Sequence, residues 1–323
     1  MDWKLTRDAI GEPQIDTFHD DPDEDLALGY AYLRALANVR EEGEEIRPGT
    51  YYFSKMTEEK LLSVGLLVVA MILAVVGVVP ARAEAAPACV TIPAVAHRGG
   101  DERFTENTDD AFRQAHNVGV PIWETDVRFT SDHVPVIMHD PDVDRTTDGT
   151  GNVADHTWAE LAAMQTDDGH SIPRLRDLVD GAYVDGARVY VELKVNPSAE
   201  EWPAFLAAMN SRPMTSKLVI TSFDTATLTA AAANAPAYAR GLIQDVGDVD
   251  PATVKPYASI LIKNHNSITA ARMSKWTTGG LTVLAWTVDD EGEWARMAWY
   301  PALAGVITDK PAAYGAWQRA RTC

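Results

Sequence analysis

Basic residues are scarce in this chain, and no run of them interrupts its acidity. Lys and Arg number 28 against 47 Asp and Glu, which gives a formal net charge of −19. Because affinity for a nucleic-acid backbone comes mainly from basic side chains, we expect no nucleic-acid partner. The acidity favours solubility, and it still allows an anionic ligand where a bound cation and a few basic groups reverse the local sign.

Cysteine is nearly absent as well, with only Cys89 and Cys323 in the chain. These two residues lie at the two ends of the predicted mature domain, and the termini of a compact domain often lie close together. We therefore predict one Cys89–Cys323 disulfide in an exported chain, with two free thiols as the alternative. The densest acidic run, residues 19–25, lacks the glycine and terminal glutamate of an EF-hand loop, so we interpret it as a solvated turn.

Charge is missing altogether from residues 61–79, an apolar stretch that leads to the small-residue pattern Ala81-Arg82-Ala83. We predict a secretory signal over 56–83, cleaved after Ala83, so that the mature protein is secreted. The segment after Met56 is not clearly basic, and the stretch is long enough to cross a bilayer. An uncleaved membrane anchor, with the following domain outside the cell, is the alternative. Residues 1–55 would then be an acidic N-terminal extension, either cytoplasmic or not part of the native product.

Residues 84–323 form the predicted main domain, in which short apolar runs alternate with helical patterns from residue 92 onward. This alternation is typical of βα units and a parallel sheet. An α/β fold of the (β/α)8 TIM-barrel type is expected, with one of nine candidate strands accessory to the barrel. A doubly wound sheet is the alternative, disfavoured because no glycine-rich phosphate loop follows the first strand. The candidate strands begin near Ala94, Pro121, Val134, Val189, Leu218, Gly241, Ile260, Thr282 and Val306.

Charged side chains alternate with apolar ones in two of these strands. Side chains alternate faces at a period of two, so Glu124 and Asp126 share one face, as do Glu192 and Lys194. Three carboxylates and a lysine that point into a barrel mouth are costly unless they bind something. We therefore predict that Glu124, Asp126 and Glu192 hold a hard cation, and an ion-pair network that includes Lys194 is the alternative.

Two histidines, His97 and His139, each end a strand-like run. Two imidazoles that exchange a proton near neutral pH, beside a cation site, are typical of a phosphodiesterase. Arg98 follows His97 directly and could clamp a phosphate in bidentate fashion. The next helix is expected to start near residues 106–108, where Asn107 and Thr108 are candidate caps and Glu106 is a candidate further ligand.

Nine segments along residues 92–315 share the motifs of one known family: AHRGG (96–100), ENTDDAF (106–112), ETDV (124–127), VPVIMHDPDVDRTTDGTG (134–151), IPRLRDLVD (172–180), VELK (191–194), TSFD (221–224), AWTVDD (285–290) and GVITDKP (305–311). They resemble those of the glycerophosphodiester phosphodiesterase family, in its secreted bacterial form. The resemblance implies a phospholipase-C-like phosphodiesterase barrel, with a small cap formed by an insert at about 141–173, after the third strand. One departure is Asp289, which stands where the family motif usually has asparagine.

The resemblance also implies roles for individual residues. His97 and His139 would be the general acid/base pair, with Ca²⁺ or Mg²⁺ as the cofactor. The implied activity is metal-dependent hydrolysis of a small glycerophosphodiester to glycerol 3-phosphate and an alcohol. The implied metal ligands are Glu124, Asp126 and Glu192, the phosphate contacts are Arg98 and Lys194, and the pocket aromatics are Trp286 and Phe223.

Alternatives for the function remain within the same barrel type. One is a phospholipase D-like enzyme that acts on lysophospholipids, and another is an enzyme that cleaves glycerol-phosphate wall polymers. A non-enzymatic surface-binding protein is disfavoured, because such a protein would be expected to have lost a histidine or a metal carboxylate. Membrane contact is expected only through residues 61–79, if that segment is not cleaved.

Overall fold

The computed structural model describes residues 4–7, 13–16, 91–100 and 102–321. The chain divides into two compact units, residues 1–80 and 81–323. In the first unit, β1 (Lys4–Arg7) and β2 (Pro13–Asp16) pair antiparallel. Among the helices that are described, none combines the length and apolar character needed to cross a membrane. The predicted signal segment at 56–83 and both cysteines fall outside the described residues, so cleavage and the disulfide stay predictions.

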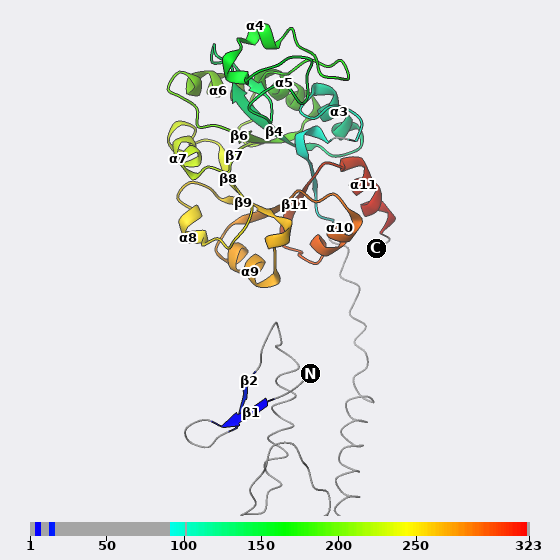
Figure 1. The fold of residues 1–323 in the computed structure, drawn as a ribbon, viewed down its shortest axis with the longest axis vertical. Coiled ribbons are helices and arrows are strands. Elements are labelled where there is room, and N and C mark those ends of the chain that lie inside the picture. Colours follow the sequence, from blue (N-terminus) through cyan, green and yellow to red (C-terminus); the bar gives the residue numbers. More distant parts are fainter. Residues whose placement is uncertain (1–3, 8–12, 17–90, 101, 322–323) are drawn as a thin grey trace, which may run out of the picture. The chain divides into compact units, whose positions relative to one another are not determined.

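Eight parallel strands close into a ring in the second unit (Figure 1). Strand β11 pairs with β3, and β3 pairs with β4 through Ala96 and Trp123, which completes the closure. This arrangement confirms the predicted (β/α)8 barrel and excludes the open doubly wound sheet. The barrel strands are β3 (Ala94–Ala96), β4 (Ile122–Phe129), β6 (Arg188–Leu193), β7 (Leu218–Ser222), β8 (Ala239–Gln244), β9 (Ile260–Asn264), β10 (Thr282–Trp286) and β11 (Leu303–Thr308).

Helices surround the ring on its outer side (Figure 1). Helix α3 begins as its sequence predicts: Thr108 accepts a hydrogen bond from the amide of Ala111, and two aspartates occupy the first turn. The remaining helices follow the strands in order, which places the strand carboxyl ends together at one mouth. The outer helices are α3 (Asp109–Asn117), α5 (Leu175–Asp185), α6 (Glu201–Met209), α7 (Thr225–Asn234), α8 (Pro251–Val254), α9 (Ala270–Thr278), α10 (Glu291–Met297) and α11 (Pro311–Ala320), with a short helix η3 (His265–Ser267) before α9.

Strand alternation divides the apolar side chains into two layers. In β6, Val191 and Leu193 are fully buried in the layer between the barrel and its helices, whereas Tyr190 faces the interior. This is the parity expected from a period of two. The interior is therefore packed rather than hollow, and its buried residues are Val95, Tyr190, Val219, Ile243, Ile260, Ile262, Leu284 and Ile307.

The ninth candidate strand is β5 (Pro135–Ile137), which lies outside the barrel ring. It runs antiparallel to β4, with Val127 opposite Ile137. The segment that follows, with η2 (Val153–Asp155) and α4 (Trp158–Leu161), packs on a small core of its own. This predicted cap follows the third strand in chain order, but it follows only the second strand of the barrel. The accessory strand is thus the one that begins near Val134.

Candidate active site

The segment that carries His97 leaves β3 in a conformation that few residues adopt. It forms the short helix η1 (His97–Gly99), in which Arg98 has φ +53°. Gly100 has φ +91°, and a β-carbon there would lie 2.7 Å from Pro311 at the start of α11. Strained backbone of this kind persists only where the surroundings hold it, and here it turns His97 and Arg98 toward the barrel mouth.

A carboxylate from the last barrel strand orients His97. The Nδ1 atom of His97 lies 2.5 Å from Oδ1 of Asp309, and its Nε2 atom lies 3.8 Å from Oε2 of Glu124. Burial lowers the pKa of His97, but the Asp309 hydrogen bond and the Glu124 charge outweigh it, so the pKa is raised overall. Because Nδ1 is engaged, Nε2 is the nitrogen that faces the site. Asp309 was not among the predicted site residues, although it lies in the matching segment 305–311, directly after β11.

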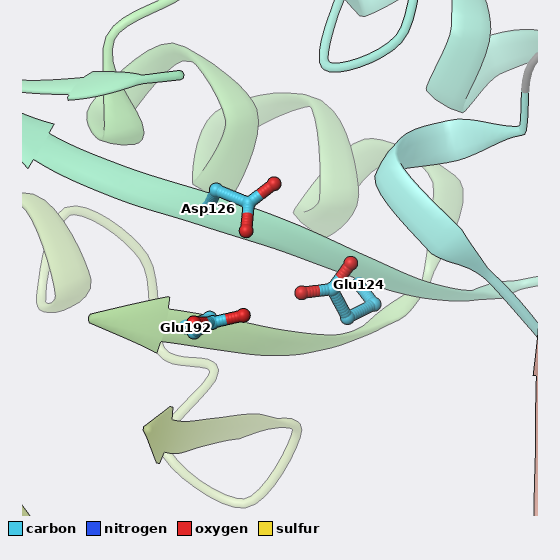
Figure 2. A group of neighbouring side chains, drawn as sticks. All are labelled: Glu124, Asp126 and Glu192. Atoms are coloured by element: carbon cyan, nitrogen blue, oxygen red, sulfur yellow. The ribbon is translucent and has the colours of Figure 1, made fainter. Parts of the chain in front are cut away.

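Three buried carboxylates gather at the carboxyl ends of two adjacent strands, as predicted. Glu124 and Asp126 project from β4 and Glu192 from β6, on the same side of the sheet (Figure 2). One ligand atom from each lies within 4.8 Å of the others, and all three residues are buried. Burial and the charge of Asp126 raise the pKa of Glu124 to about 8 and that of Glu192 to about 7. Without a counter-cation, this cluster therefore holds protons at neutral pH.

Two basic side chains contact the carboxylates. Lys194 Nζ lies 2.9 Å from Glu192 Oε1 and 3.4 Å from Asp126 Oδ1, and Arg98 Nε lies 3.4 Å from Asp126 Oδ2. Burial alone would raise the pKa of Asp126, but Lys194 and Arg98 lower it overall. Asn107 also binds this carboxylate, because its Nδ2 donates to Asp126 Oδ2 at 2.9 Å. Asn107 is therefore no helix cap, and the sequence offered no local signal for this contact.

The donor set fits a hard divalent cation. All three candidate ligands offer carboxylate oxygens, the ligand type that Ca²⁺ and Mg²⁺ prefer. Asp126 Oδ1 is buried and accepts no hydrogen bond from any described residue, so it has a free lone pair. The ion pairs with Lys194 show that part of the predicted alternative network also exists. The cation site and the ion pairs are compatible. Arg98 and Lys194 supply two positive charges for three carboxyl groups, so a negative charge remains for a cation once Glu124 and Glu192 have ionised.

His139 reaches the same region from the opposite direction. Since β5 runs antiparallel to β4, the chain returns toward the mouth, and the amide of Met138 donates to the carbonyl of Asp126 at 3.0 Å. His139 Nδ1 lies 2.7 Å from Asp140 Oδ1, so its Nε2 atom is also left for the site. Burial lowers the pKa of His139, although Asp126 and Asp140 act in the opposite direction. Both imidazoles are thus oriented in the same way: a carboxylate, that of Asp309 for His97 and that of Asp140 for His139, binds Nδ1.

A network of charged side chains joins the segments that carry the two histidines, across the mouth of the barrel. Arg145 from the cap donates to Asp140 Oδ2 at 2.5 Å and to Glu106 Oε1 at 2.6 Å, and Arg98 Nη1 donates to the same Glu106 oxygen at 3.1 Å. Glu106 therefore holds two arginines, and it does not join the carboxylate triad as a further ligand. Arg145 and Asp140 were missed as site residues, because their partners lie on separate loops.

An aromatic pair lies beside Lys194. The rings of Phe223 and Trp286 meet edge to face with centroids 5.3 Å apart, and Lys194 Nζ lies 5.9 Å from the Phe223 ring centroid. Trp286 Nε1 donates to the carbonyl of Gln244 at 3.3 Å, which fixes its ring. The structure thus brings both predicted pocket aromatics together and places Phe223 next to Lys194, one of the predicted phosphate contacts.

Comparison with known proteins places this geometry in a family. A sequence model described as "Glycerophosphoryl diester phosphodiesterase family" matches residues 97–313. A protein of Caldanaerobacter subterraneus named glycerophosphodiester phosphodiesterase is 29% identical over 230 residues, which cover 67% of this chain and 93% of the relative. Human glycerophosphodiester phosphodiesterase 1 is 39% identical over 112 residues, but that match spans only 34% of the human protein and 32% of this chain.

Solved structures agree with the sequence matches. A phosphodiesterase from Oleispira antarctica, solved in complex with the product sn-glycerol-3-phosphate, has a TM-score of 0.64 and is 26% identical. The alignment covers 70% of this chain and 96% of that one. A structure from Silicibacter pomeroyi, described as a putative glycerophosphoryl diester phosphodiesterase, has a TM-score of 0.65 at 24% identity, and it supports the fold alone.

Proposed function

Because this chain belongs to the glycerophosphoryl diester phosphodiesterase family, we propose that it hydrolyses glycerophosphodiesters to glycerol 3-phosphate and an alcohol. One observation carries the proposal: two imidazoles, each held at Nδ1 by a carboxylate, flank a buried triad of metal-binding type. The reaction needs a proton acceptor for the nucleophile and a proton donor for the leaving alkoxide, and His97 and His139 supply these two functions.

The charged residues have complementary tasks. Glu124, Asp126 and Glu192 would hold Ca²⁺ or Mg²⁺, which supplies charge stabilisation for a phosphodiester oxygen when bound. Arg98 and Lys194 offset the remaining negative charge of the phosphodiester and orient it. Phe223 and Trp286 form an apolar wall next to Lys194, suited to the carbon skeleton of the substrate.

Two nucleophiles are compatible with this arrangement. The 2-hydroxyl of the glycerol group can attack phosphorus, giving a cyclic phosphate that water then opens, or water can attack directly. In either case one histidine takes the proton of the nucleophile as it attacks phosphorus. The P–O bond to the leaving group breaks, and the other histidine protonates the departing alkoxide oxygen to give the alcohol. Phosphorus NMR during turnover separates the two routes, because only the first produces a transient cyclic phosphodiester.

Hydrolysis of glycerophosphocholine by the purified protein tests the proposal. His97→Asn and His139→Asn should each lower kcat by about 10²- to 10⁴-fold. His133→Asn is the matched control, because His133 is exposed on a loop and Asn tolerates its φ of +64°. Activity near wild type in either site variant would exclude that histidine from the chemistry.

The cation requirement is tested by removing and restoring it. Treatment with a chelator should abolish turnover, and titration with Ca²⁺ or Mg²⁺ alone should restore it and identify the preferred ion. Undiminished activity after chelation would remove the cation from the mechanism.

A lysophospholipid is a second candidate substrate, favoured by apolar side chains at the rim. Val195 is 41% exposed, Phe223 45% and Val246 73%. They lie on the loops that follow three neighbouring strands, β6, β7 and β8. Such a rim beside the phosphate contacts suits an acyl chain. Val246→Ser should lower kcat/KM for lysophosphatidylcholine about five-fold and leave glycerophosphocholine unaffected.

The control for this substitution is Val184→Ser. Val184 is also exposed, but it lies at the end of α5 that leads into β6, on the face opposite the mouth. Equal effects of the two substitutions on both substrates would refute an acyl site at the rim.

We further propose that the enzyme works outside the cell. The proposal rests on the uncharged segment 61–79 and the Ala81-Arg82-Ala83 pattern. The N-terminal sequence of protein recovered from culture medium should begin at Glu84. A product retained in the membrane fraction would favour the anchor instead.

A further inference from the structure

Asp309, the residue that holds His97, is itself held by a second carboxyl group. Asp289 lies between β10 and α10, and its Oδ1 accepts hydrogen bonds from the amide of Asp309 at 2.8 Å and from Thr308 Oγ1 at 2.9 Å. The amide of Val288 donates to the carbonyl of Ile307 at 3.0 Å, which fixes this segment beside β11. Asp289 is therefore positioned by the backbone of the strand end that carries Asp309.

The carboxyl groups of Asp289 and Asp309 also lie close enough to interact directly, beside the hydrogen bond from the Asp309 amide to Asp289. Two adjacent carboxyl groups attract each other through a hydrogen bond only if one of them keeps its proton, and otherwise they repel. Asp309 also accepts the bond from His97 Nδ1, so it is the member of the pair that needs to be ionised. The proton then belongs on Asp289, whose hydrogen bonds come from two neutral donors, the Thr308 hydroxyl and the Asp309 amide.

The charges around the pair favour the same assignment. Burial raises the pKa of Asp289, the hydrogen bond from the Asp309 amide lowers it, and the negative charge of Asp309 raises it again, so that the pKa is raised overall. Burial would also raise the pKa of Asp309, but the hydrogen bond and charge of His97, together with Arg98, lower it overall. The neighbouring Asp290 takes no part, because its side chain caps α10 by accepting from the amide of Glu293.

We propose that Asp289 is a positioning residue which, as the neutral acid, donates a hydrogen bond to Asp309 and so holds the Asp309 carboxylate on Nδ1 of His97. The proposal rests on the proposed function, in which His97 moves a proton at Nε2. When Asp289 ionises, the donor is lost and two adjacent carboxylates repel each other, so His97 loses its fixed orientation. The charged groups that face Asp289 in this step are Asp309 and His97, with Arg98 acting on Asp309.

Two substitutions of Asp289 test whether its side chain acts as a hydrogen-bond donor or only fills space in the packing. Asp289→Asn keeps a donor that does not titrate, whereas Asp289→Ala removes it. Because a hydrogen bond to a charged group is lost, Asp289→Ala should lower kcat about 10- to 100-fold with little change in KM. Asp289→Asn should keep kcat near wild type and move the alkaline fall of kcat to higher pH. Asp290→Asn is the matched control, since Asn also serves as a helix cap and should leave the profile unchanged.

The measurements are kcat and KM for glycerophosphocholine across pH, at saturating cation, with thermal unfolding to show that each variant is folded. Wild-type kcat in Asp289→Ala would overturn the proposal. A loss in Asp289→Asn equal to that in Asp289→Ala would overturn the donor role. An Asp289→Asn profile superimposed on that of the wild type would overturn the assignment of a neutral acid.

A second readout does not depend on turnover. Proton NMR should show a downfield imidazole N–H resonance for the His97–Asp309 bond, absent from His97→Asn. This resonance should persist in Asp289→Asn and be lost or broadened in Asp289→Ala. If the wild type fails to cleave glycerophosphodiesters, the proposed function fails, and the NMR result still decides whether Asp289 positions Asp309.

Discussion

Cation binding at the carboxylate triad should release protons, by an amount that depends on pH. Burial and the Asp126 charge raise the pKa of Glu124 to about 8 and that of Glu192 to about 7, so both are largely protonated at pH 6 when no cation is bound. A divalent cation requires the ionised form of its ligands. Binding should therefore release about two protons at pH 6 and about half a proton at pH 8.

The apparent affinity for the cation should depend on pH as well. Because the cation competes with these protons, its apparent affinity should fall roughly a few hundred-fold between pH 8 and pH 6. The stability of the metal-free protein should fall as pH rises toward 8, since the folded state holds protons that the unfolded chain has lost above its ordinary carboxyl pKa. Saturating cation should consequently raise Tm more at pH 8 than at pH 6.

Isothermal titration of metal-free protein with Ca²⁺ measures the release directly. At each pH the titration is run in two buffers of different ionisation enthalpy, and the difference in heat gives the number of protons. Glu192→Gln is the matched variant, and it should release about one proton at pH 6. Release below about half a proton at pH 6, or release that does not diminish by pH 8, would refute the view that buried Glu124 and Glu192 are protonated before the cation binds.

Three further substitutions test other parts of the structure. Asp309→Asn should lower kcat about 10²- to 10⁴-fold without changing the cation affinity measured by calorimetry, because it disturbs the orientation of His97 and not the triad. Gly100→Ala should cost about 1–3 kcal/mol in urea unfolding, because its φ is +91° and a β-carbon would meet Pro311, whereas Gly169→Ala, with similar φ and open space, should cost less. Phe205→Ala, in the fully buried outer layer, should cost about 3–5 kcal/mol in the same assay, with kcat unchanged in the folded protein.

Local periodicity is enough to find the triad. The alternation of side chains along a strand is a property of the extended backbone, so the shared face of Glu124 and Asp126 follows from two residues of spacing. The placement of Glu192 at the same mouth also follows, because parallel strands bring their carboxyl ends to one end of the barrel. These predictions needed no knowledge of which strands are neighbours.

Strand direction was not predictable in the same way. The run near Val134 is short and apolar, and such a run carries no information on whether it joins a ring or folds back on its neighbour. The structure pairs β5 antiparallel with β4, which returns His139 toward Asp126 instead of placing it at the end of a barrel strand.

The barrel, the two strand-end histidines and the shared location of the three carboxylates could all be predicted from the order of the amino acids, because each is marked by a local pattern with the period of the backbone. Which carboxylate holds which imidazole could not be predicted, because it depends on contacts between distant segments. His97 and Asp309 are 212 residues apart, and the position of Asp289 relative to them depends on how the ends of β10 and β11 meet. Contacts of this kind arise from closure of the ring, which no local pattern encodes.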